Sequence, residues 1–252
     1  MSESALGRLP GRSHRWCLFL DLDGTLIEFA AAPELARPPS DLVPLLERVS
    51  HALDGAVAII TGRAVSEVDR LLAPLRLPAA GLHGVERRDA EGRFGRCPVD
   101  TAAVAAARRA MHSLAERYPD AILEDKGLAV ALHYRRNPAI GPALIECVRS
   151  IAQELGPSIQ MQNGVFVCEL KPSAANKRTA VETFLAEPPF LARRPIFVGD
   201  DETDRDAFDA VACHGGLAIA VGTQVASGWR LRNPAAVRRW LAQIAHFTAL
   251  TE

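Results

Sequence analysis

The hydrophobic positions of the chain form two alternating patterns. Short continuous apolar runs lie at 16–20, 56–60, 79–82, 195–199 and 217–221. Segments with helical spacing lie between and after them, at 41–52, 65–72, from about 176 and 203, and after 233. Continuous apolar runs are typical of buried parallel strands, and strands that alternate with helices build a parallel sheet with right-handed crossovers. The pattern predicts an α/β fold with a Rossmann-like parallel-sheet core. Ser40 is placed to cap the first helix.

The middle of the chain follows a different pattern. Residues 86–97 are rich in Arg and Gly and predict a loop or hairpin. After them, a helix followed by two strands occurs twice, with helices near 101–117 and 139–155 and strands near 122–124, 128–134, 158–162 and 165–170. Asn163-Gly164 between apolar runs is a strong short-range signal for a hairpin turn. We therefore expect an inserted α+β domain with an antiparallel sheet at 86–171, a core made of 16–85 and 172–252, and a disordered tail at 1–15.

Composition excludes several classes of protein. Twenty-nine basic and thirty acidic residues give a net charge of -1, which argues against a dedicated nucleic-acid binder. No apolar stretch approaches the roughly 20 residues of a membrane span. The five cysteines are scattered without a CxxC pair, as is typical of reduced thiols. The first fifteen residues contain no apolar core of a signal peptide, so we expect a cytoplasmic protein that binds neither membrane nor nucleic acid.

The first candidate for chemistry follows the strand at 16–20 directly. Asp21-Leu22-Asp23-Gly24-Thr25 places two carboxylates at the carboxyl end of a parallel strand, where open α/β sheets bind their ligands. Side chains two residues apart in an extended segment point to the same side. One carboxylate could serve as a nucleophile and the other as an acid or base. The alternative is an ordinary turn that ends the strand, because Asp and Gly are common in turns.

Three further candidates also follow strands or begin helices. The Thr61 hydroxyl and Gly62 amide could hold a phosphoryl oxygen, or Thr61 could only cap the next helix. Lys177 at a helix start opposes the helix dipole, which makes sense if an anion binds there, but it could also be a solvated surface lysine. Gly199-Asp-Asp-Glu-Thr-Asp204 concentrates the oxygen ligands that Mg²⁺ selects, although an acidic helix start capped by Thr203 is the alternative.

The order of these motifs resembles the haloacid-dehalogenase-type phosphatases, and the inserted domain resembles their cap. The sequence is more closely similar to the trehalose-6-phosphate phosphatases, from about Leu18 to Leu241. The segments that carry this second resemblance are Gly81–Glu86, Glu124–Leu128, His133–Arg135, Glu169–Pro172, Asn176-Lys177 and Gly199–Phe208. Three positions depart from that family's usual pattern: Leu22, Arg178 and Arg205. None of them removes a catalytic group.

The resemblance implies roles for the residues at the strand ends. Asp21 is the nucleophile that forms an aspartyl-phosphate, and Asp23 is the acid and base, so we expect its neighbours to favour the protonated carboxyl. Thr61, Gly62 and Lys177 bind phosphoryl oxygens, and Arg63 is a further candidate for substrate binding. The resemblance further implies that Mg²⁺ is held by Asp21, the backbone carbonyl of Asp23 and Asp200. Asp204 either binds the metal through water or orients Lys177.

The resemblance also assigns the cap to substrate selection. Glu124, Lys126 and Glu169 would bind trehalose hydroxyls, with His133, Arg135 and Lys171 as further candidates. An exposed strand edge with solubilising charges is the alternative. His83 is expected to be structural, with substrate contact as a minor alternative.

The implied function is Mg²⁺-dependent hydrolysis of trehalose 6-phosphate to trehalose and phosphate by a monomer, with association with a trehalose-phosphate synthase as an option. Alternatives are a phosphatase for sucrose phosphate or mannosylglycerate phosphate, a phosphomutase, or a sugar-phosphate sensor without activity.

Overall fold

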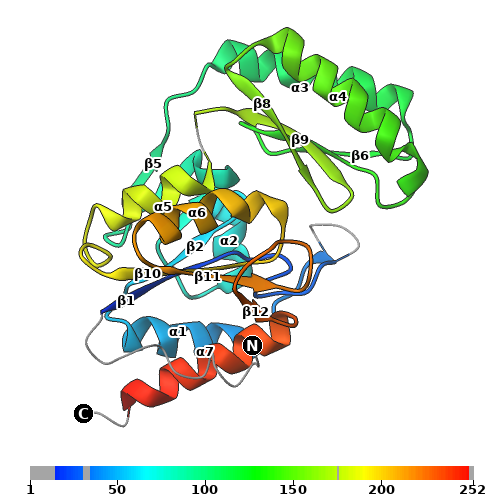
Figure 1. Ribbon diagram of the computed structural model, residues 1–252. Helices are drawn as coiled ribbons and strands as arrows, with labels where there is room; N and C mark the ends of the chain where they lie inside the picture. The colour runs from blue at the N-terminus through cyan, green and yellow to red at the C-terminus, as the bar shows by residue number, and fades with distance from the viewer. Residues whose placement is uncertain (1–14, 31–34, 175, 250–252) are drawn as a thin grey trace. The chain divides into compact units, whose positions relative to one another are not determined.

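The chain forms two compact units, which are described separately below. The computed structural model describes residues 15–30, 35–174 and 176–249 (Figure 1). One unit comprises 1–95 and 177–252, and the other comprises 96–176. The boundaries expected at 86 and 171 lie before these divisions, because the hairpin that follows residue 85 belongs to the sheet of the larger unit. Nearly all of the tail expected at 1–15 lies outside the described residues.

The larger unit is built on one sheet, which has eight strands among the described residues. They are β1 (Trp16–Leu20), β2 (Val57–Ile60), β3 (Ala79–Gly81), β4 (Glu86–Arg88), β5 (Phe94–Arg96), β10 (Arg194–Gly199), β11 (Leu217–Val221) and β12 (Trp229–Leu231). Their order is β12-β11-β10-β1-β2-β3-β4-β5. The six strands from β12 to β3 are parallel, and β4 pairs antiparallel with β3. The parallel core predicted from the apolar runs is confirmed.

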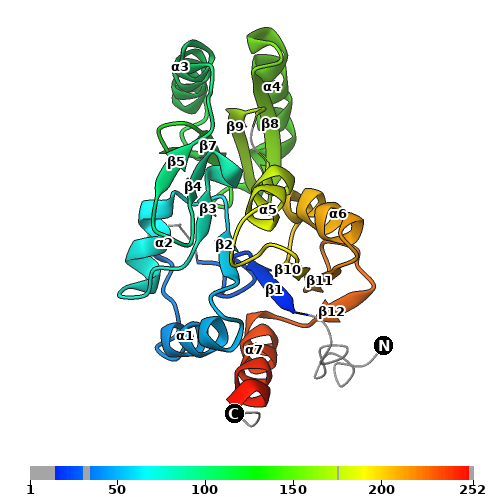
Figure 2. The same cartoon turned by 90° about the vertical axis from the view of Figure 1, so that its left-hand side faces the viewer.

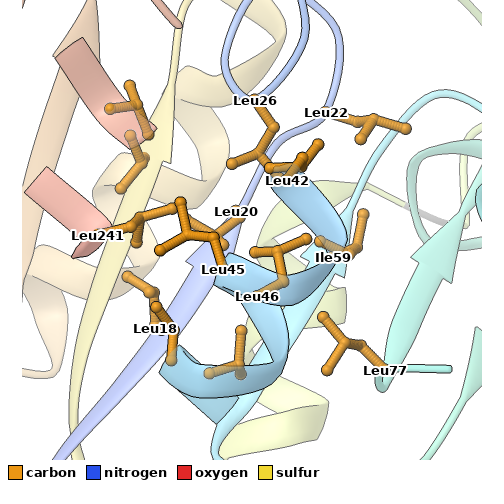
Figure 3. Packing of buried hydrophobic residues seen from close by; sticks show 14 of the residues in the cluster. Leu18, Leu20, Leu22, Leu26, Leu42, Leu45, Leu46, Ile59, Leu77 and Leu241 are labelled. Atoms are coloured by element: carbon orange, nitrogen blue, oxygen red, sulfur yellow. The ribbon is translucent and has the colours of Figure 1, made fainter. Parts of the chain in front are cut away.

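Helices cover both faces of this sheet. The five helices are α1 (Leu42–Ala52), α2 (Val65–Leu72), α5 (Lys177–Leu185), α6 (Arg205–Cys213) and α7 (Pro234–Ala249). One hydrophobic cluster joins β1 and β2 to α1, α2 and α7, and a second joins the opposite side to α5 and α6 (Figures 1 and 2). Figure 3 shows leucines of α1 packed against Leu18, Leu20 and Ile59. This three-layer packing fixes the strand ends on which the candidate residues lie.

Two local predictions differ from the structure in this unit. Asp41, and not Ser40, is the N-cap of α1, and its side chain makes no capping hydrogen bond. The strand β12 has no counterpart in the predicted pattern, because three residues are too few for a recognisable apolar run. Its backbone pairs with β11 and widens the sheet by one strand.

The smaller unit is an antiparallel sheet covered by two helices. Its elements are α3 (Thr101–Arg117), β6 (Ile122–Asp125), β7 (Val130–His133), α4 (Gly141–Leu155), β8 (Ile159–Gly164) and β9 (Val167–Pro172). The strand order is β6-β7-β9-β8. The helices α3 and α4 cover one face of this sheet (Figure 1). Leu132, Cys168 and Leu170 pack in one cluster with residues of these helices, and their neighbours in sequence lie on the other face of the sheet. This second face carries the polar candidates.

The hairpin between β8 and β9 turns two residues later than predicted. Gly164 is the register partner of Val167, so Val165 and Phe166 form the turn, and Asn163-Gly164 belongs to β8. Phe166 takes a left-handed φ of 59° and packs edge-on against Tyr134 at 6.0 Å. This aromatic contact lies outside the local sequence pattern, and the turn signal of Asn-Gly is overridden.

Two predicted absences concern the chain as a whole. All five cysteines are free thiols. None of the helices in the described ranges combines the length and apolar character that a membrane-crossing segment requires.

Candidate active site

The predicted motifs meet at the carboxyl ends of three neighbouring strands. Asp21 follows β1, Thr61 follows β2, and Asp200 follows β10. Because β1 lies between β10 and β2 in the sheet, these residues share one edge. The backbone N–H of Asp21 donates to the carbonyl of Val198 at 3.0 Å and so extends the pairing beyond the strand. This edge is the ligand position that the fold class predicts.

A buried ion-pair chain is the centre of the site. The Lys177 Nζ donates to Asp21 Oδ1 at 2.7 Å and to Asp204 Oδ1 at 2.6 Å. The exposed fractions are 3% for Lys177, 6% for Asp21 and 0% for Asp204. An ammonium buried this deeply needs the charges of both carboxylates. The alternative of a solvated surface lysine is therefore wrong.

The acidic segment after β10 is folded around its own carboxylates. Asp204 Oδ2 accepts from the N–H of Asp200 at 2.9 Å and from that of Asp201 at 3.2 Å. Asp201 caps the short 3₁₀ turn at Glu202–Asp204 by accepting from the N–H of Thr203 at 2.8 Å. Thr203 is thus not the cap that one sequence alternative assigned to it. Thr25 donates its hydroxyl to Asp200 Oδ1 at 3.1 Å and joins the segment to the first motif.

Three carboxylates in this site are arranged as a set of hard oxygen donors. Oxygen atoms of Asp21, Asp200 and Asp204 lie within 4.8 Å of one another, and all three residues are buried. Gly24, at a φ of 78°, allows the chain to approach this cluster, since a Cβ there would overlap the Asp200 carboxylate. Carboxylate oxygens in this arrangement fit a cation such as Mg²⁺ or Ca²⁺.

The electrostatics of the cluster also favour a bound cation. Burial raises the pKa of Asp200 to about 8, and the neighbouring carboxylates of Asp204 and Asp201 add to the shift. Burial likewise raises the pKa of Asp21 and of Asp204, although Lys177 opposes both shifts. For Lys177, burial would lower the pKa, but Asp204 and Asp21 raise it, so the lysine stays protonated. One ammonium among these carboxylates leaves excess negative charge that a divalent cation would neutralise.

Asp23 lies in a different environment from Asp21. Its two carboxylate oxygens accept from Arg63 Nε at 2.6 Å and Arg63 Nη2 at 2.8 Å, a bidentate pair. A second acid, Glu67, lies 3.8 Å from the same guanidinium. This pair holds the Asp23 carboxylate in a fixed orientation. The expectation that the neighbours of Asp23 favour its protonated form stays a prediction. Arg63 was predicted to bind substrate, and here it binds Asp23.

The Thr61–Gly62 loop leads from β2 toward α2. Thr61 is 1% exposed, and its Oγ1 accepts from the backbone N–H of Arg63 at 3.2 Å. Ala64 is the N-cap of α2, so Thr61 does not cap that helix. The buried Glu86 provides a carboxylate there instead, since its Oε2 accepts from the N–H of Val65 at 3.1 Å. The alternative role of Thr61 as a simple helix cap is not supported.

In the smaller unit, four of the predicted residues form one polar cluster. His133 Nε2 lies 2.7 Å from Glu124 Oε2, and the Lys126 Nζ lies 3.3 Å from Glu169 Oε2 and 3.9 Å from Glu124 Oε2. Glu124 and Glu169 are both aligned with Ala131 across the sheet, so they share the face opposite the helices. Burial opposes ionisation of Glu124, but His133 and Lys126 lower its pKa.

Arg135 and Lys171 lie at the margin of this polar cluster. The Arg135 guanidinium lies 5.8 Å from the centroid of the Phe166 ring, at the hairpin turn. Lys171 is buried on β9, two residues after Glu169 and on the same face.

The unusual arginine beside the catalytic lysine candidate points toward acids on the surface. Arg178 lies 3.3 Å from Glu182 and 3.9 Å from Asp209 of α6. The guanidinium of Arg178 thus lies between carboxylates that are both exposed.

Comparison with known proteins identifies first the class and then the family. A phosphatase of the haloalkanoate (HAD) enzyme superfamily from Bacteroides thetaiotaomicron has a similar fold, with a TM-score of 0.60 at 15% identity over 94% of this chain and 97% of that one. The C-terminal domain of C. albicans trehalose-6-phosphate phosphatase superposes with a TM-score of 0.87 at 21% identity, over 98% and 97%. The fold is therefore that of the HAD phosphatases, a Rossmann-like core with a cap.

The family follows from the sequence comparisons. The family model described as trehalose-phosphatase matches residues 19–234. The trehalose-6-phosphate phosphatase of Escherichia coli (strain K12) is 38% identical over 248 residues, which are 98% of this chain and 92% of that protein. The chain belongs to the trehalose-phosphatase family.

Some contacts of the site were not predicted from the sequence. The pairing of Arg63 with Asp23 and the bond from Thr25 to Asp200 join residues that are 40 and 175 positions apart. Their signal in the sequence is only that each lies within a strand-end motif. Glu86 lies in the segment Gly81–Glu86, which carries part of the family resemblance, but the segment alone does not indicate that its carboxylate contacts the start of α2.

Proposed function

We propose that this protein is a Mg²⁺-dependent phosphatase that hydrolyses trehalose 6-phosphate to trehalose and phosphate. The single observation that carries the proposal is the buried chain from Asp21 through Lys177 to Asp204, at the strand ends of a chain in the trehalose-phosphatase family. A nucleophile, a fixed cation and an acidic donor set in one buried place are what phosphoryl transfer by a carboxylate requires.

In the first step, Asp21 attacks the phosphorus atom of the substrate. A bond forms between an Asp21 carboxylate oxygen and phosphorus, the bond from phosphorus to the sugar oxygen breaks, and that oxygen takes a proton from Asp23. Lys177 holds Asp21 at 2.7 Å and so orients the attacking oxygen. The product of this step is an aspartyl-phosphate and free trehalose. Positioning supplies much of the catalysis in such a reaction.

In the second step, water attacks the phosphorus of the aspartyl-phosphate. Asp23 takes the proton of the water, the new bond from phosphorus to oxygen forms, and the bond to Asp21 breaks. The bidentate pair with Arg63, at 2.6 and 2.8 Å, orients the Asp23 carboxyl group for this proton transfer. The Thr61 hydroxyl, the Gly62 amide and the Lys177 ammonium are our candidates for binding the remaining phosphoryl oxygens.

A divalent metal fits the residues that are present. Asp21 and Asp200 would hold it with the backbone carbonyl of Asp23, and Asp204 would support it through water or through Lys177. When bound, Mg²⁺ supplies charge neutralisation and orientation of the phosphoryl group. The support for this assignment is the buried oxygen cluster of Asp21, Asp200 and Asp204.

The polar cluster of the smaller unit is proposed to select the sugar. Glu124, Lys126 and Glu169 supply two acceptors and one donor on one sheet face, which suits a molecule with many hydroxyl groups. His133 fixes Glu124 from the neighbouring strand. A site that expects hydroxyl partners rejects a substrate without them, because its polar groups are then left unpaired.

The test is phosphate release from trehalose 6-phosphate in the presence of Mg²⁺, with glucose 6-phosphate and sucrose 6-phosphate beside it. We expect strong preference for the first substrate and loss of release in Asp21→Asn. Asp209→Asn is the matched control, because Asp209 is an exposed acid of α6 that lies 3.9 Å from Arg178. Phosphate release from another sugar phosphate alone would overturn the assignment of trehalose 6-phosphate as the substrate. Equal activity of the wild type and Asp21→Asn would overturn the assignment of Asp21 as the nucleophile.

Three further parts of the expected function stay predictions. They are a monomeric state, association with a trehalose-phosphate synthase, and a cytoplasmic location.

A further inference from the structure

The segment Gly81–Glu86 has no part in the mechanism above, and its backbone is unusual. Leu82, His83 and Gly84 have φ values of 49°, 56° and 109°, so two non-glycine residues in succession adopt the left-handed region. A bulky residue rarely takes this conformation, and it persists where the surrounding structure fixes it. Such residues gather at functional sites. The question is therefore what fixes this segment.

Three of its hydrogen bonds lead to the loop that follows β2. The backbone N–H of Leu82 donates to the Arg63 carbonyl at 2.9 Å, and that of His83 donates to the Thr61 carbonyl at 3.0 Å. Glu86 accepts from the N–H of Val65 at 3.1 Å. These bonds reach residues on both sides of Gly62. Two backbone N–H groups of the left-handed turn and the carboxylate of Glu86 thus form hydrogen bonds with one stretch of chain, residues 61–65.

The imidazole of His83 supplies a further contact, with Gly62 itself. A Cβ at position 62 would lie 2.8 Å from both Cε1 and Nε2 of His83, which is closer than real side chains approach. His83 is 6% exposed, so its ring has little room to move. Gly62 has no left-handed φ that would demand glycine. The ring of His83 is therefore what demands glycine at this position.

We propose that Gly81–Glu86 is a brace for the phosphate-binding loop, and that His83 is a positioning residue that fixes the Gly62 amide through ring contact. The inference rests on the proposed function, which places a phosphoryl oxygen at Thr61 and Gly62. Hydrogen bonds hold the neighbours of Gly62, and the imidazole fills the space beside its Cα. Without the ring, the space beside the Gly62 Cα is no longer filled, so the position of the amide is less well defined.

The first test replaces the ring and measures binding of inorganic phosphate. His83→Asn keeps a residue that tolerates the left-handed region. In the presence of Mg²⁺, calorimetry should show phosphate binding about tenfold weaker than in the wild type, and kcat/KM should fall up to about 100-fold, the cost of a misplacement near 1 Å. Leu46→Ala, a buried leucine of α1, is the control that lowers Tm without changing phosphate affinity. Unchanged affinity in folded His83→Asn overturns the brace.

The second test uses the steric contact between the two residues. Gly62→Ala should lose phosphate binding and activity, and the double variant Gly62→Ala with His83→Asn should recover to the level of His83→Asn, because the added methyl group then has space. Gly95→Ala is the matched control, since nothing lies within 4 Å of a Cβ there. Equal loss in Gly62→Ala and the double variant overturns the steric contact.

Calorimetry separates this inference from the proposed function. If the wild type binds phosphate but releases none from any sugar phosphate, the proposed function fails, and the affinities of the variants still decide the brace. If the wild type with Mg²⁺ binds no phosphate, then residues 61–65 are not a phosphate-binding loop, and the proposed role of His83 is overturned as well.

Discussion

The two units carry charge clusters of similar composition and different character. In the larger unit, Lys177 joins Asp21 and Asp204 at 2.7 and 2.6 Å, and all three residues are more than nine-tenths buried. In the smaller unit, Lys126 lies at 3.3 Å from Glu169 and 3.9 Å from Glu124, and only Glu169 is fully buried. Each cluster thus has one lysine between two acids.

The difference matters because burial decides what an ion pair can do. Removing one partner of a buried pair leaves an uncompensated charge, whereas a partly exposed pair exchanges its partners with water at little cost. The cluster of the larger unit is therefore suited to one fixed chemistry. In the cluster of the smaller unit, hydrogen bonds to sugar hydroxyls can replace the contacts between Lys126 and its two acids. Under the proposed function, reaction and selection are separated between the two units.

The largest expected effect is the difference in stability between two variants, in which the lysine of each cluster is replaced by methionine. Lys177→Met should abolish activity and lower the free energy of unfolding by about 3–5 kcal/mol, because two buried carboxylates lose their cation. Lys126→Met should lower the free energy of unfolding by less, because the ion pairs of Lys126 are longer and Glu124 is more exposed. Urea unfolding of both variants, with phosphate release, measures the contrast. Equal losses of stability would contradict the distinction between the clusters.

The next effect is that of metal and pH on the larger unit. Removal of Mg²⁺ by a chelator should abolish activity, and its return should restore it. Because the pKa of Asp200 is raised to about 8 in the metal-free protein, protons compete with the metal below that pH. The rise in Tm on adding Mg²⁺ should therefore be larger at pH 8.5 than at pH 6. In Asp200→Asn, that rise should be small at both pH values, and a full rise would speak against Asp200 as a ligand.

A smaller effect is expected from the cluster of the smaller unit. Glu169→Gln removes the charge but keeps the shape, so KM for trehalose 6-phosphate should rise about 10- to 100-fold, the worth of a hydrogen bond to a charged group. The preference over glucose 6-phosphate should fall in parallel. Glu146→Gln is the control, since Glu146 is an exposed acid of α4 paired with Arg149. An unchanged preference would remove Glu169 from substrate selection.

The smallest effect is expected at the departure from the family pattern. Arg178→Gly restores the usual residue and removes contacts with Glu182 and Asp209, which are both on the surface. Activity should stay within about twofold, since exposed ion pairs contribute at most about 1 kcal/mol. Steady-state kinetics of this variant is the measurement, and a tenfold change in KM would show that the charge of Arg178 acts on the substrate.

The sequence was informative where local pattern and burial agree. The strands at 16–20 and 217–221 and the helices at 65–72 and 101–117 have the predicted bounds, because each carries its own apolar pattern. The strand-end position of Asp21 and Asp200 followed from the parallel sheet alone. These are the features for which neighbours in sequence are also neighbours in structure.

Other features depend on contacts between distant segments, and these were not predictable. The Phe166 ring of the turn at Val165-Phe166 packs against Tyr134, and Asp23 pairs with Arg63. A pattern of residue types does not indicate such partners. The sequence pattern therefore predicted which residues form the site better than it predicted which residues they contact.

The insertion of the smaller unit has a consequence for how the protein is made. Lys177 follows Asp21 by 156 residues, and β1 is joined to β10 only after all of residues 96–176 have been synthesised. Chains fold domain by domain during synthesis, and distant strand pairs form late. We therefore expect a nascent chain in which residues 96–176 fold first, while β1 waits with one edge unpaired. Such a chain is inactive until β10 and the acids behind it emerge from the ribosome.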